Sequence, residues 1–336
     1  MIGTSLLFSG SIGGLISPFD TIAPTASYSL RNLTLSYSSD VVLVRRDSDN
    51  AFQAFKANEI TNGTLSNFLT TLGSTSHAQQ LAIDLEPDVS LVCSCDSGSA
   101  GVLEAQDVLY IDGLVFAWYD QSGNGYHALQ PAAASQPKIW DAITGLVTEN
   151  GRPALDFDGT DDYLTILNSA SDGSNPLNIN GDIFCAMILA PTEARSAYVF
   201  NNYQGASAPY TGQHILWHQD PAGADVTFET SYDDNSTPST LVSTSQSLGQ
   251  YIVTNVRNDG GTNYLYINAV QNVSGADTAT GDILSDQDWV IGARAEDATG
   301  EIWKGQMQEI ILYDSDQSAN RSDIESNIND YYDIYP

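Results

Sequence analysis

Positively charged residues are scarce in this chain of 336 residues. Lys and Arg number 11 against 42 Asp and Glu, which gives a net charge of -31 at pH 7. A protein that binds nucleic acid neutralises phosphates with Lys and Arg, and docking on anionic lipid headgroups also needs basic residues. The composition therefore argues against a nucleic-acid partner and against an anionic membrane surface. The same charge keeps a crowded assembly soluble through self-repulsion.

Cysteine is scarce as well. The three cysteines, Cys93, Cys95 and Cys185, cannot form a disulfide framework for a chain of this size, and an odd number leaves at least one thiol unpaired. The Cys-Ser-Cys stretch lacks the second ligand pair that zinc requires. Free thiols are therefore favoured over a zinc site.

Long apolar runs and a basic N-terminus are both missing. The stretch MIGTSLLFSGSIGGLISPF is broken by Ser and Gly, and it falls short of the roughly 20 apolar residues that span a bilayer. No Lys or Arg precedes Arg31, so the positive start of a secretory signal is absent. We expect neither a secretory signal nor membrane insertion. Residues 1–25 are predicted to form a docking arm, with an edge strand of the same chain as the alternative, and residues 26–336 to form the folded domain.

Ser, Thr, Asn and Gly are abundant, which is the composition of many short strands joined by polar turns. The runs LVFAWYD (114–120) and DIFCAMILA (182–190) are apolar on both alternating faces and predict strands buried on both sides. Asn-Gly at 150–151, Asp-Gly at 158–159 and NDGG at 258–261 predict hairpin turns.

Helices are expected at only a few places. Short ones are predicted within 26–37 and within 65–72, and a terminal helix after residue 318 would bury Ile324 and Ile328 on one face. With strands this closely spaced, the predicted fold class is all-β: an antiparallel β-sandwich with short N-terminal and C-terminal helices.

The stretch WYDQSGNGYHALQ (118–130) follows the first buried strand. Its Asp120 can cap a turn through the carboxylate, and Gly123 and Gly125 can take a positive φ without a Cβ clash. We interpret this stretch as architecture that shapes the end of a core strand.

Five motifs follow one another in a specific order: ASYSLRNL at 26–33, VRRDSDN at 44–50, WYDQSGNGYHALQ at 118–130, QPKI at 136–139 and ENGRPALDFDGTDDYL at 149–164. This order resembles the concanavalin A-like, laminin G-like jelly-roll superfamily. Within it, the likeness is to the catalytic domain of α-L-arabinofuranosidase B and to related modules of phage structural proteins. The resemblance covers most of the chain from about residue 26, and it implies two antiparallel sheets packed face to face, one of them often binding sugars.

For catalysis the resemblance implies less. Retaining glycosidases place two carboxylates about 5 to 5.5 Å apart, and Glu229, Glu296 and Asp297 fall in the corresponding parts of this chain without a clean motif match. The adjacent cysteine pair that lines the sugar pocket of the family is missing here. A retaining glycoside hydrolase is therefore the alternative hypothesis.

A sugar-binding surface is predicted around HILWHQD. An exposed Trp or Tyr stacks on the apolar face of a sugar, while Asp accepts hydrogen bonds from its hydroxyls. The candidate residues are Trp217, Tyr203, Tyr210, Tyr232 and Asp220. The competing interpretation, which we favour for Trp217, is that this side chain belongs to the core.

The turn LDFDGTDDYL carries Asp156, Asp158, Asp161 and Asp162. Clustered carboxylates supply the hard oxygen ligands that calcium takes, but the glycine follows the second Asp directly, unlike the glycine of an EF-hand loop. A turn with solvated acids is favoured. No cofactor is expected, with calcium as the alternative.

These observations favour a non-enzymatic, lectin-like structural or adhesion protein, a phage virion component such as a fibre, tail or capsid-decorating subunit. Such a protein would assemble in the host cytoplasm, contact other virion proteins through residues 1–25 and bind a host glycan. We expect a homo-oligomer, with a trimer as the first expectation. The alternatives are the arabinofuranosidase-like hydrolase and a lectin without a virion context.

Overall fold

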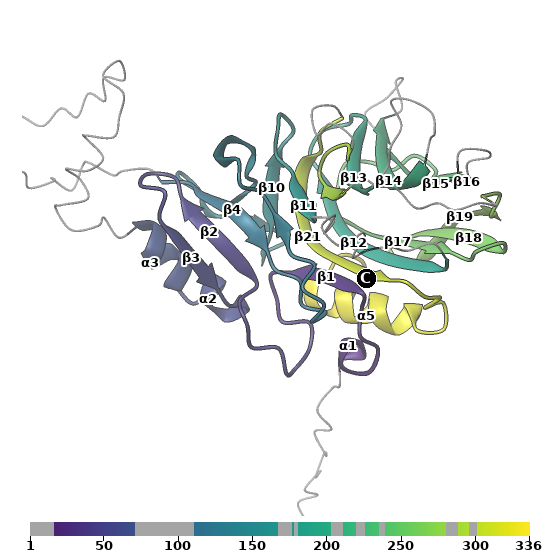
Figure 1. Ribbon diagram of the computed structural model, residues 1–336, viewed down its shortest axis with the longest axis horizontal. Helices are drawn as coiled ribbons and strands as arrows, with labels where there is room; N and C mark the ends of the chain where they lie inside the picture. Colours follow the sequence, from purple (N-terminus) through teal and green to yellow (C-terminus); the bar gives the residue numbers. More distant parts are fainter. Residues whose placement is uncertain are drawn as a thin grey trace, which may run out of the picture.

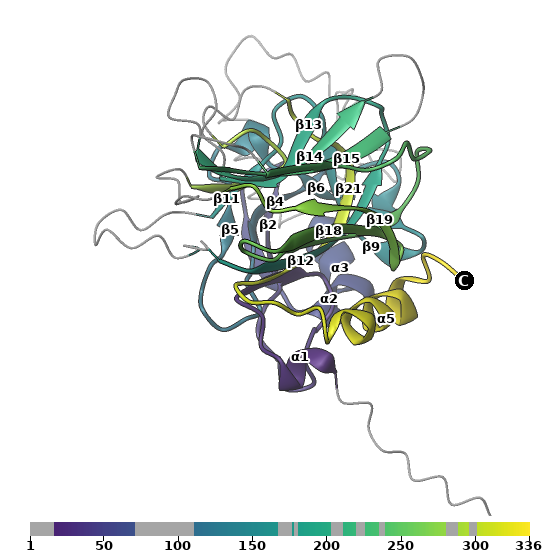
Figure 2. The same ribbon diagram turned by 90° about the vertical axis from the view of Figure 1, so that its right-hand side faces the viewer.

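The chain is an all-β protein made of two antiparallel sheets that pack face to face (Figures 1 and 2). The computed structural model describes residues 17–70, 111–166, 177, 181–202, 211–219, 226–234, 239–279, 288–295 and 301–336, with the backbone alone for 211–219, 226, 233 and 234. Every strand pairing in these ranges is antiparallel, as in the central ladder between β12 and β21. The predicted antiparallel β-sandwich is confirmed.

We call the first layer the back sheet. Its strands pair in the order β19, β18, β17, β12 and β21, and both β1 and β10 pair with the far edge of β21. The bounds are β19 Val270–Ala276, β18 Thr262–Ile267, β17 Tyr251–Arg257, β12 Ile183–Pro191, β21 Lys304–Tyr313, β1 Ala26–Ser29 and β10 Leu155–Asp158.

We call the second layer the front sheet. Its strands pair in the order β16, β15, β14, β13, β20, β11 and β5. The bounds are β16 Ser239–Val242, β15 Val226–Asp234, β14 Thr211–Gln219, β13 Ala197–Asn201, β20 Trp289–Ile291, β11 Leu164–Ile166 and β5 Ala128–Leu129.

Further strands join the two layers along one side. β4 pairs with β5 of the front sheet and with β6, and β6 pairs with β10 of the back sheet. The bounds here are β2 Val42–Arg46, β3 Phe52–Phe55, β4 Gly113–Trp118, β6 Lys138–Asp141 and β7 Gly145–Leu146, with the small hairpin of β8 Thr148–Glu149 and β9 Arg152–Pro153. At the opposite edges the described strands β16 and β19 do not pair with each other, but the side-chain oxygen of Asn272 on β19 accepts a hydrogen bond from the backbone N–H of Thr244, just after β16, at 2.8 Å.

Helices cover the outside of this framework. Their bounds are α1 Pro18–Thr21, α2 Ala57–Thr61, α3 Thr64–Thr70 and α5 Arg321–Tyr332, with a 3₁₀ turn at Ala133–Ser135. The terminal helix α5 lies along the outer face of the back sheet (Figure 1). It buries Ile324 and Ile328, as predicted from their spacing. No helix in the described part of the chain has the length and apolar character to cross a membrane.

Strand β12 shows why the back sheet is buried on both sides. All nine of its residues are buried. Cys185 and Met187 point into the main core between the sheets, whereas Phe184 and Ala186 point to the second cluster under α5. Because side chains alternate along a strand, an unbroken apolar run is needed to satisfy both faces. The prediction for 182–190 is confirmed.

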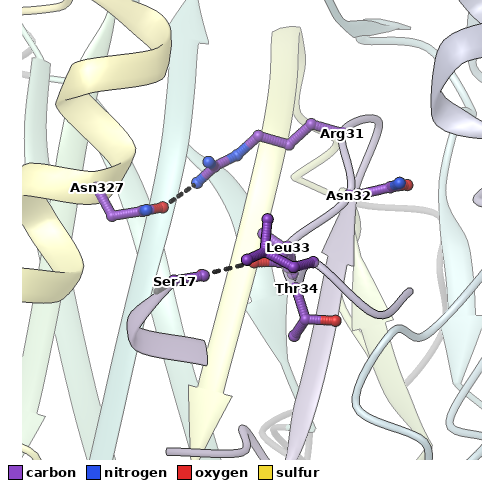
Figure 3. A pocket seen from close by; sticks show the side chains of 7 residues that line it. Ser17, Arg31, Asn32, Leu33, Thr34 and Asn327 are labelled. Atoms are coloured by element: carbon purple, nitrogen blue, oxygen red, sulfur yellow. Dashed lines mark hydrogen bonds between the residues drawn. The ribbon is translucent and has the colours of Figure 1, made fainter. Parts of the chain in front are cut away.

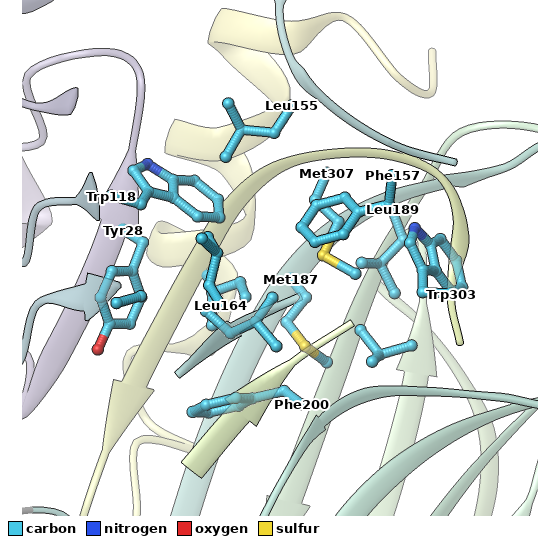
Figure 4. Close-up of a cluster of buried hydrophobic side chains, with 14 of the residues drawn as sticks. Tyr28, Trp118, Leu155, Phe157, Leu164, Met187, Leu189, Phe200, Trp303 and Met307 are labelled. Atoms are coloured by element: carbon cyan, nitrogen blue, oxygen red, sulfur yellow. The ribbon is translucent and has the colours of Figure 1, made fainter. Parts of the chain in front are cut away.

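The main core fills the space between the two sheets. Figure 4 shows Trp118, Met187, Phe200 and Met307 converging there from four strands of different layers. Trp118 is fully buried, and Trp289 is nearly so. Burial of each such side chain contributes roughly 1.5 to 3 kcal/mol, so this cluster is the main source of stability.

The turn after β4 fastens the N-terminal strand to the core. The Asp120 carboxylate accepts hydrogen bonds from the backbone N–H groups of Ser27, Ser122 and Tyr126 at 2.9, 2.9 and 3.1 Å. Gly123 has φ +90° and sits in open space, so its backbone conformation explains why glycine stands there. The architectural interpretation of WYDQSGNG agrees with these contacts.

Three local predictions are wrong. Residues 26–29 form strand β1 and no helix, because they pair with β21 at the far end of the chain. The Asp-Gly turn at 158–159 makes no hairpin: β10 pairs with β21 and β6, while β11 pairs with β20 and β5. In β4 only one face is fully buried, since Leu114 and Phe116 are half-exposed.

The predicted docking arm is divided by the structure. Residues 17–25 pack on the chain itself: Phe19 is buried in the cluster beneath α5, and the backbone oxygen of Ile22 accepts a hydrogen bond from the Tyr313 hydroxyl at 3.0 Å. Residues 1–16 lie outside the described residues. The docking role of residues 1–25 stays a prediction.

Candidate functional site on the front sheet

The outer face of the front sheet carries Glu229, one of the three acids predicted from the sequence. Along β15, Phe228 and Tyr232 point into the main core. Because side chains alternate, Thr227, Glu229 and Ser231 point to the opposite face. Thr227 and Glu229 are half-buried there, and Ser231 is 5% exposed. The site therefore begins with Glu229, which is half-buried.

Two rows of residues cross the strands on this face. Glu229 pairs with Val242 of β16 and, through Leu216 of β14, with Tyr198 of β13. Val242 is 44% exposed, whereas Tyr198 is buried. Directly opposed residues of an antiparallel pair lie on the same face about 5 Å apart. The first row thus offers an apolar side chain beside a carboxylate.

The second row carries hydroxyl and amide groups. Ser231 pairs with Thr240 of β16 and, through His214 of β14, with Asn201 of β13. The Ser231 and Thr240 hydroxyl oxygens lie 2.9 Å apart in a hydrogen bond. Thr240 is exposed. Together we call Glu229, Ser231, Thr240 and Val242 the outer-face set.

Asn201 anchors the backbone that leads to the other predicted acids. Its Nδ2 donates to the backbone oxygen of Ala293 at 2.7 Å, and its Oδ1 accepts from the backbone N–H of Ala295 at 2.9 Å. Glu296 and Asp297 follow directly but lie outside the described residues. Since one strand separates β13 from β15, Asn201 lies about 10 Å from β15, and the backbone it holds follows β20, which pairs with the other edge of β13.

Of the five residues predicted for a sugar-binding surface, only Tyr232 has a described side chain. Tyr232 is only 3% exposed and points into the core, so its ring is not available at the surface. The backbone of Trp217 pairs with that of Phe228, but its side chain lies outside the described part, as do Tyr203, Tyr210 and Asp220. Those four assignments stay predictions.

Tyr232 belongs to a polar cluster inside the sandwich. Its hydroxyl donates to Oδ1 of Asn255, and the Arg257 guanidinium lies over its ring, 5.2 Å from the centroid. Arg257 is fully buried and pairs with Asp277 at 3.0 Å. Burial raises the pKa of the Tyr232 phenol. The cluster therefore holds the β15 end of the front sheet to the back sheet.

Sequence reasoning missed Asn201, Ser231 and Thr240. Alternation along VTFETSYDD would have placed Ser231 on the face of Glu229. No local signal indicates that β16 (Ser239–Val242) is the strand beside β15, or that β14 connects β13, which carries Asn201, to β15. Those neighbours are set by long-range pairing.

The acidic turn between β10 and β11 gathers three of its four predicted carboxylates. Oxygens of Asp158, Asp161 and Asp162 lie within 4.8 Å of one another. Asp162 is 5% exposed, and its Oδ2 accepts from the backbone N–H of Asp158 at 2.9 Å. Burial, and then the neighbouring Asp158 and Asp161, raise the pKa of Asp162 to about 7.

Asp156 stands apart from this group. Its carboxylate accepts from Nε2 of Gln306 on β21 at 2.5 Å, and burial raises its pKa. The donor set of the other three fits a hard cation such as calcium in chemistry. Two of the three already have roles in the turn: Asp162 as described, and Asp158, whose Oδ1 accepts from the backbone N–H of Thr160 at 2.6 Å.

A shallow hollow lies beside the terminal helix. Its volume is about 280 Å³, and Ser17, Arg31, Leu33 and Asn327 are among the residues around it (Figure 3). The Arg31 guanidinium is bound to Glu309 at 2.8 and 3.0 Å and to Asn327 at 2.8 Å. Glu309 is fully buried. Arg31 therefore links α5 to β21, and its Nε and Nη2 donors are used in these bonds.

The fold is similar to that of solved arabinofuranosidases. No protein-family model matches the sequence, and no curated protein matches it. An arabinofuranosidase complexed with arabinofuranosyl-α-1,2-xylobiose has a TM-score of 0.58 at 16% identity, covering 91% of this chain and 62% of that chain. A glutamate-to-glutamine mutant of an α-L-arabinofuranosidase of glycoside hydrolase family 54, soaked with 4-nitrophenyl α-L-arabinofuranoside, has 0.58 at 14% identity and the same coverage.

A weaker likeness is to the carbohydrate-binding module of the Ruminococcus gnavus IT-sialidase bound to α2,3-sialyllactose, with a TM-score of 0.40 at 11% identity, covering 52% of this chain and 95% of that chain. The chain covers 62% of each of the two arabinofuranosidase structures, which is less than two thirds of their length. At these identities the similarity concerns the β-sandwich itself.

Proposed function

We propose that this protein is a non-enzymatic, lectin-like β-sandwich that binds a glycan on the outer face of its front sheet. The observation that carries the proposal is the contrast between the two outer faces. The back sheet turns apolar residues outward, and α5 covers them. The front sheet instead presents Glu229, Thr240 and Val242, and no helix of the described part of the chain covers these strands.

The chemistry of this face suits a sugar. A carboxylate accepts hydrogen bonds from two neighbouring hydroxyls, and a Thr or Ser hydroxyl both donates and accepts. A small apolar side chain such as Val242 suits the C–H face of a pyranose or furanose ring. The similarity of the fold to an arabinofuranosidase complexed with arabinofuranosyl-α-1,2-xylobiose supports a sugar as the ligand.

We place this binding protein in a phage virion, as a fibre, tail or capsid-decorating subunit. The net charge of -31 suits a surface component that must stay soluble in a repetitive assembly. Residues 1–25, of which 17–25 pack on their own chain, would contact other virion proteins, and subunits would form a homo-oligomer, first expected to be a trimer.

Removal of the Glu229 carboxylate tests the binding face. Glu229→Ala is expected to weaken glycan binding roughly tenfold to a hundredfold, because a hydrogen bond to a charged group contributes about 1.5 to 3 kcal/mol. Glu193→Ala is the matched control, since Glu193 is an exposed acid on the turn after β12. Binding is measured on a glycan array and then by calorimetry. Equal binding by both variants would remove the outer face from the proposal.

A retaining hydrolase is the second candidate. The observation in its favour is that Asn201 holds the backbone just before Glu296 and Asp297 on the same sheet as Glu229. The test is release of 4-nitrophenol from 4-nitrophenyl α-L-arabinofuranoside, with Glu229→Gln as the control. Turnover by the wild type that this variant abolishes would replace the lectin proposal, and absence of turnover by folded protein dismisses the hydrolase.

A further inference from the structure

The strands of the outer face come from a part of the sequence without a single positive charge. Between Arg195 and Arg257 the chain has no Lys or Arg. This part supplies β13, β14, β15 and β16 and all the connections between them. Its acids are Asp220, Asp225, Glu229, Asp233 and Asp234.

Ten of the eleven Lys and Arg residues are engaged with other groups of the chain, and the eleventh, Lys56, is exposed at the start of α2. All eleven Lys and Arg residues lie in the described ranges. Eight of them form ion pairs with carboxylates of the chain: Arg31, Arg45, Arg46, Lys138, Arg257, Arg294, Lys304 and Arg321. Arg195 donates to the backbone oxygen of Gly159, and Arg152 lies over the ring of Tyr331.

Arg294 is the cation to consider beside the outer face. It lies between Ala293 and Ala295, the two residues that Asn201 holds. Its side chain is half-buried and faces Glu301, with 3.8 Å between Nη1 and Oε2. Arg294 therefore already has a carboxylate partner from its own loop.

We infer that the outer face selects uncharged glycans and rejects those that carry a carboxylate or a sulfate. This inference rests on the proposed glycan-binding function. Proteins recognise anionic groups with Arg or Lys, most often through a bidentate guanidinium. The outer face offers Glu229 in that place, and the charge of the surrounding sequence repels a second anion.

Matched pairs of glycans test the selectivity. The pairs are lactose with α2,3-sialyllactose, agarose-derived with carrageenan-derived galactan oligosaccharides, and arabinoxylan with glucuronoarabinoxylan oligosaccharides. Within each pair that is bound, the uncharged member is expected to bind at least tenfold more tightly at 20 mM NaCl. Because salt screens exposed charges over about 3 Å at 1 M, the ratio should fall severalfold at 1 M NaCl.

Two lysine substitutions locate the effect. Val242→Lys puts a cation opposite Glu229, whereas Val270→Lys puts one at the start of β19, where Val270 is 69% exposed. Both variants change the net charge by the same amount. Val242→Lys is expected to reduce the preference for the uncharged member at least fivefold, and Val270→Lys to leave it unchanged. A third variant, Arg294→Gln, should also leave it unchanged.

The outcomes separate the inference from the proposed function. If the wild type binds none of the glycans, the proposed function fails and the inference fails with it. If it binds the anionic member of a pair as tightly as the uncharged one, the inference alone is overturned. Equal effects of the two lysine variants, or a changed ratio in Arg294→Gln, would also overturn it, because the selectivity would then arise away from the outer face.

Discussion

The carboxyl group of Asp162 is expected to make the stability of this protein depend on pH. Asp162 is buried in the turn between β10 and β11, beside Asp158 and Asp161, and its pKa is raised from 3.8 to about 7. The folded state therefore keeps the proton up to about pH 7, whereas the unfolded chain loses it near pH 4. The contribution of protonated Asp162 to the free energy of unfolding is fully present below about pH 4 and is lost as the pH rises to about 7.

The size of the effect follows from the shift of about three pKa units. At about 1.36 kcal/mol per unit, ionisation of Asp162 costs the folded state at most about 4 kcal/mol. Between pH 5 and pH 8 the expected loss of stability is about 2.5 kcal/mol. Asp162→Asn removes the ionisable group, and its amide oxygen can still accept from the backbone N–H of Asp158.

Urea unfolding at pH 5 and pH 8 measures this difference. The Asp162→Asn variant is expected to lose about 2.5 kcal/mol less than the wild type between the two pH values. Asp330→Asn is the control, because this substitution removes the same charge and Asp330 is exposed on α5. If both variants keep the full pH dependence of the wild type, Asp162 does not titrate in this range and the reasoning fails.

Three further predictions concern stability. Asp120→Ala should lower the free energy of unfolding by about 3 kcal/mol, since the carboxylate accepts four hydrogen bonds; Asp330→Ala should change it by less than about 0.5 kcal/mol. Gly305→Ala should lower the free energy of unfolding, measured by thermal unfolding, by more than about 3 kcal/mol, because the new Cβ would lie 2.3 Å from the backbone oxygen of Ala190. Its control, Gly123→Ala, lies in open space and should lower it by about 1 kcal/mol. Raising NaCl from 20 mM to 1 M should raise the unfolding temperature, since it screens a net charge of -31; an unchanged temperature would contradict this.

Local patterns predicted several elements correctly because their cause is local. The doubly apolar run of β12 and the spacing of Ile324 and Ile328 in α5 reflect which faces are buried. The hairpin at 150–151 forms as predicted, with Asn150 at φ 48° and Gly151 at φ 70°. Turn chemistry and side-chain period are properties of a few adjacent residues.

The candidate site depended on the pairing of distant strands. Alternation along β15 separates Glu229 and Ser231 from Phe228 and Tyr232, but it does not say which set faces the core. That was decided by burial of Phe228 and Tyr232 against the back sheet. The sequence alone did not show that Tyr232 is buried, which is why it was grouped with a sugar-binding surface.

The sequence by itself determined the fold class, the shortage of cations and the elements whose signals are local. Only the tertiary structure decided that residues 26–29 are a strand, since their partners on β21 lie at the other end of the chain. It also decided that Asn201, Glu229 and Thr240 share one face. The physical reason is that a β-ladder is held by hydrogen bonds between segments far apart in sequence, and a one-residue change of register would turn every side chain to the opposite face.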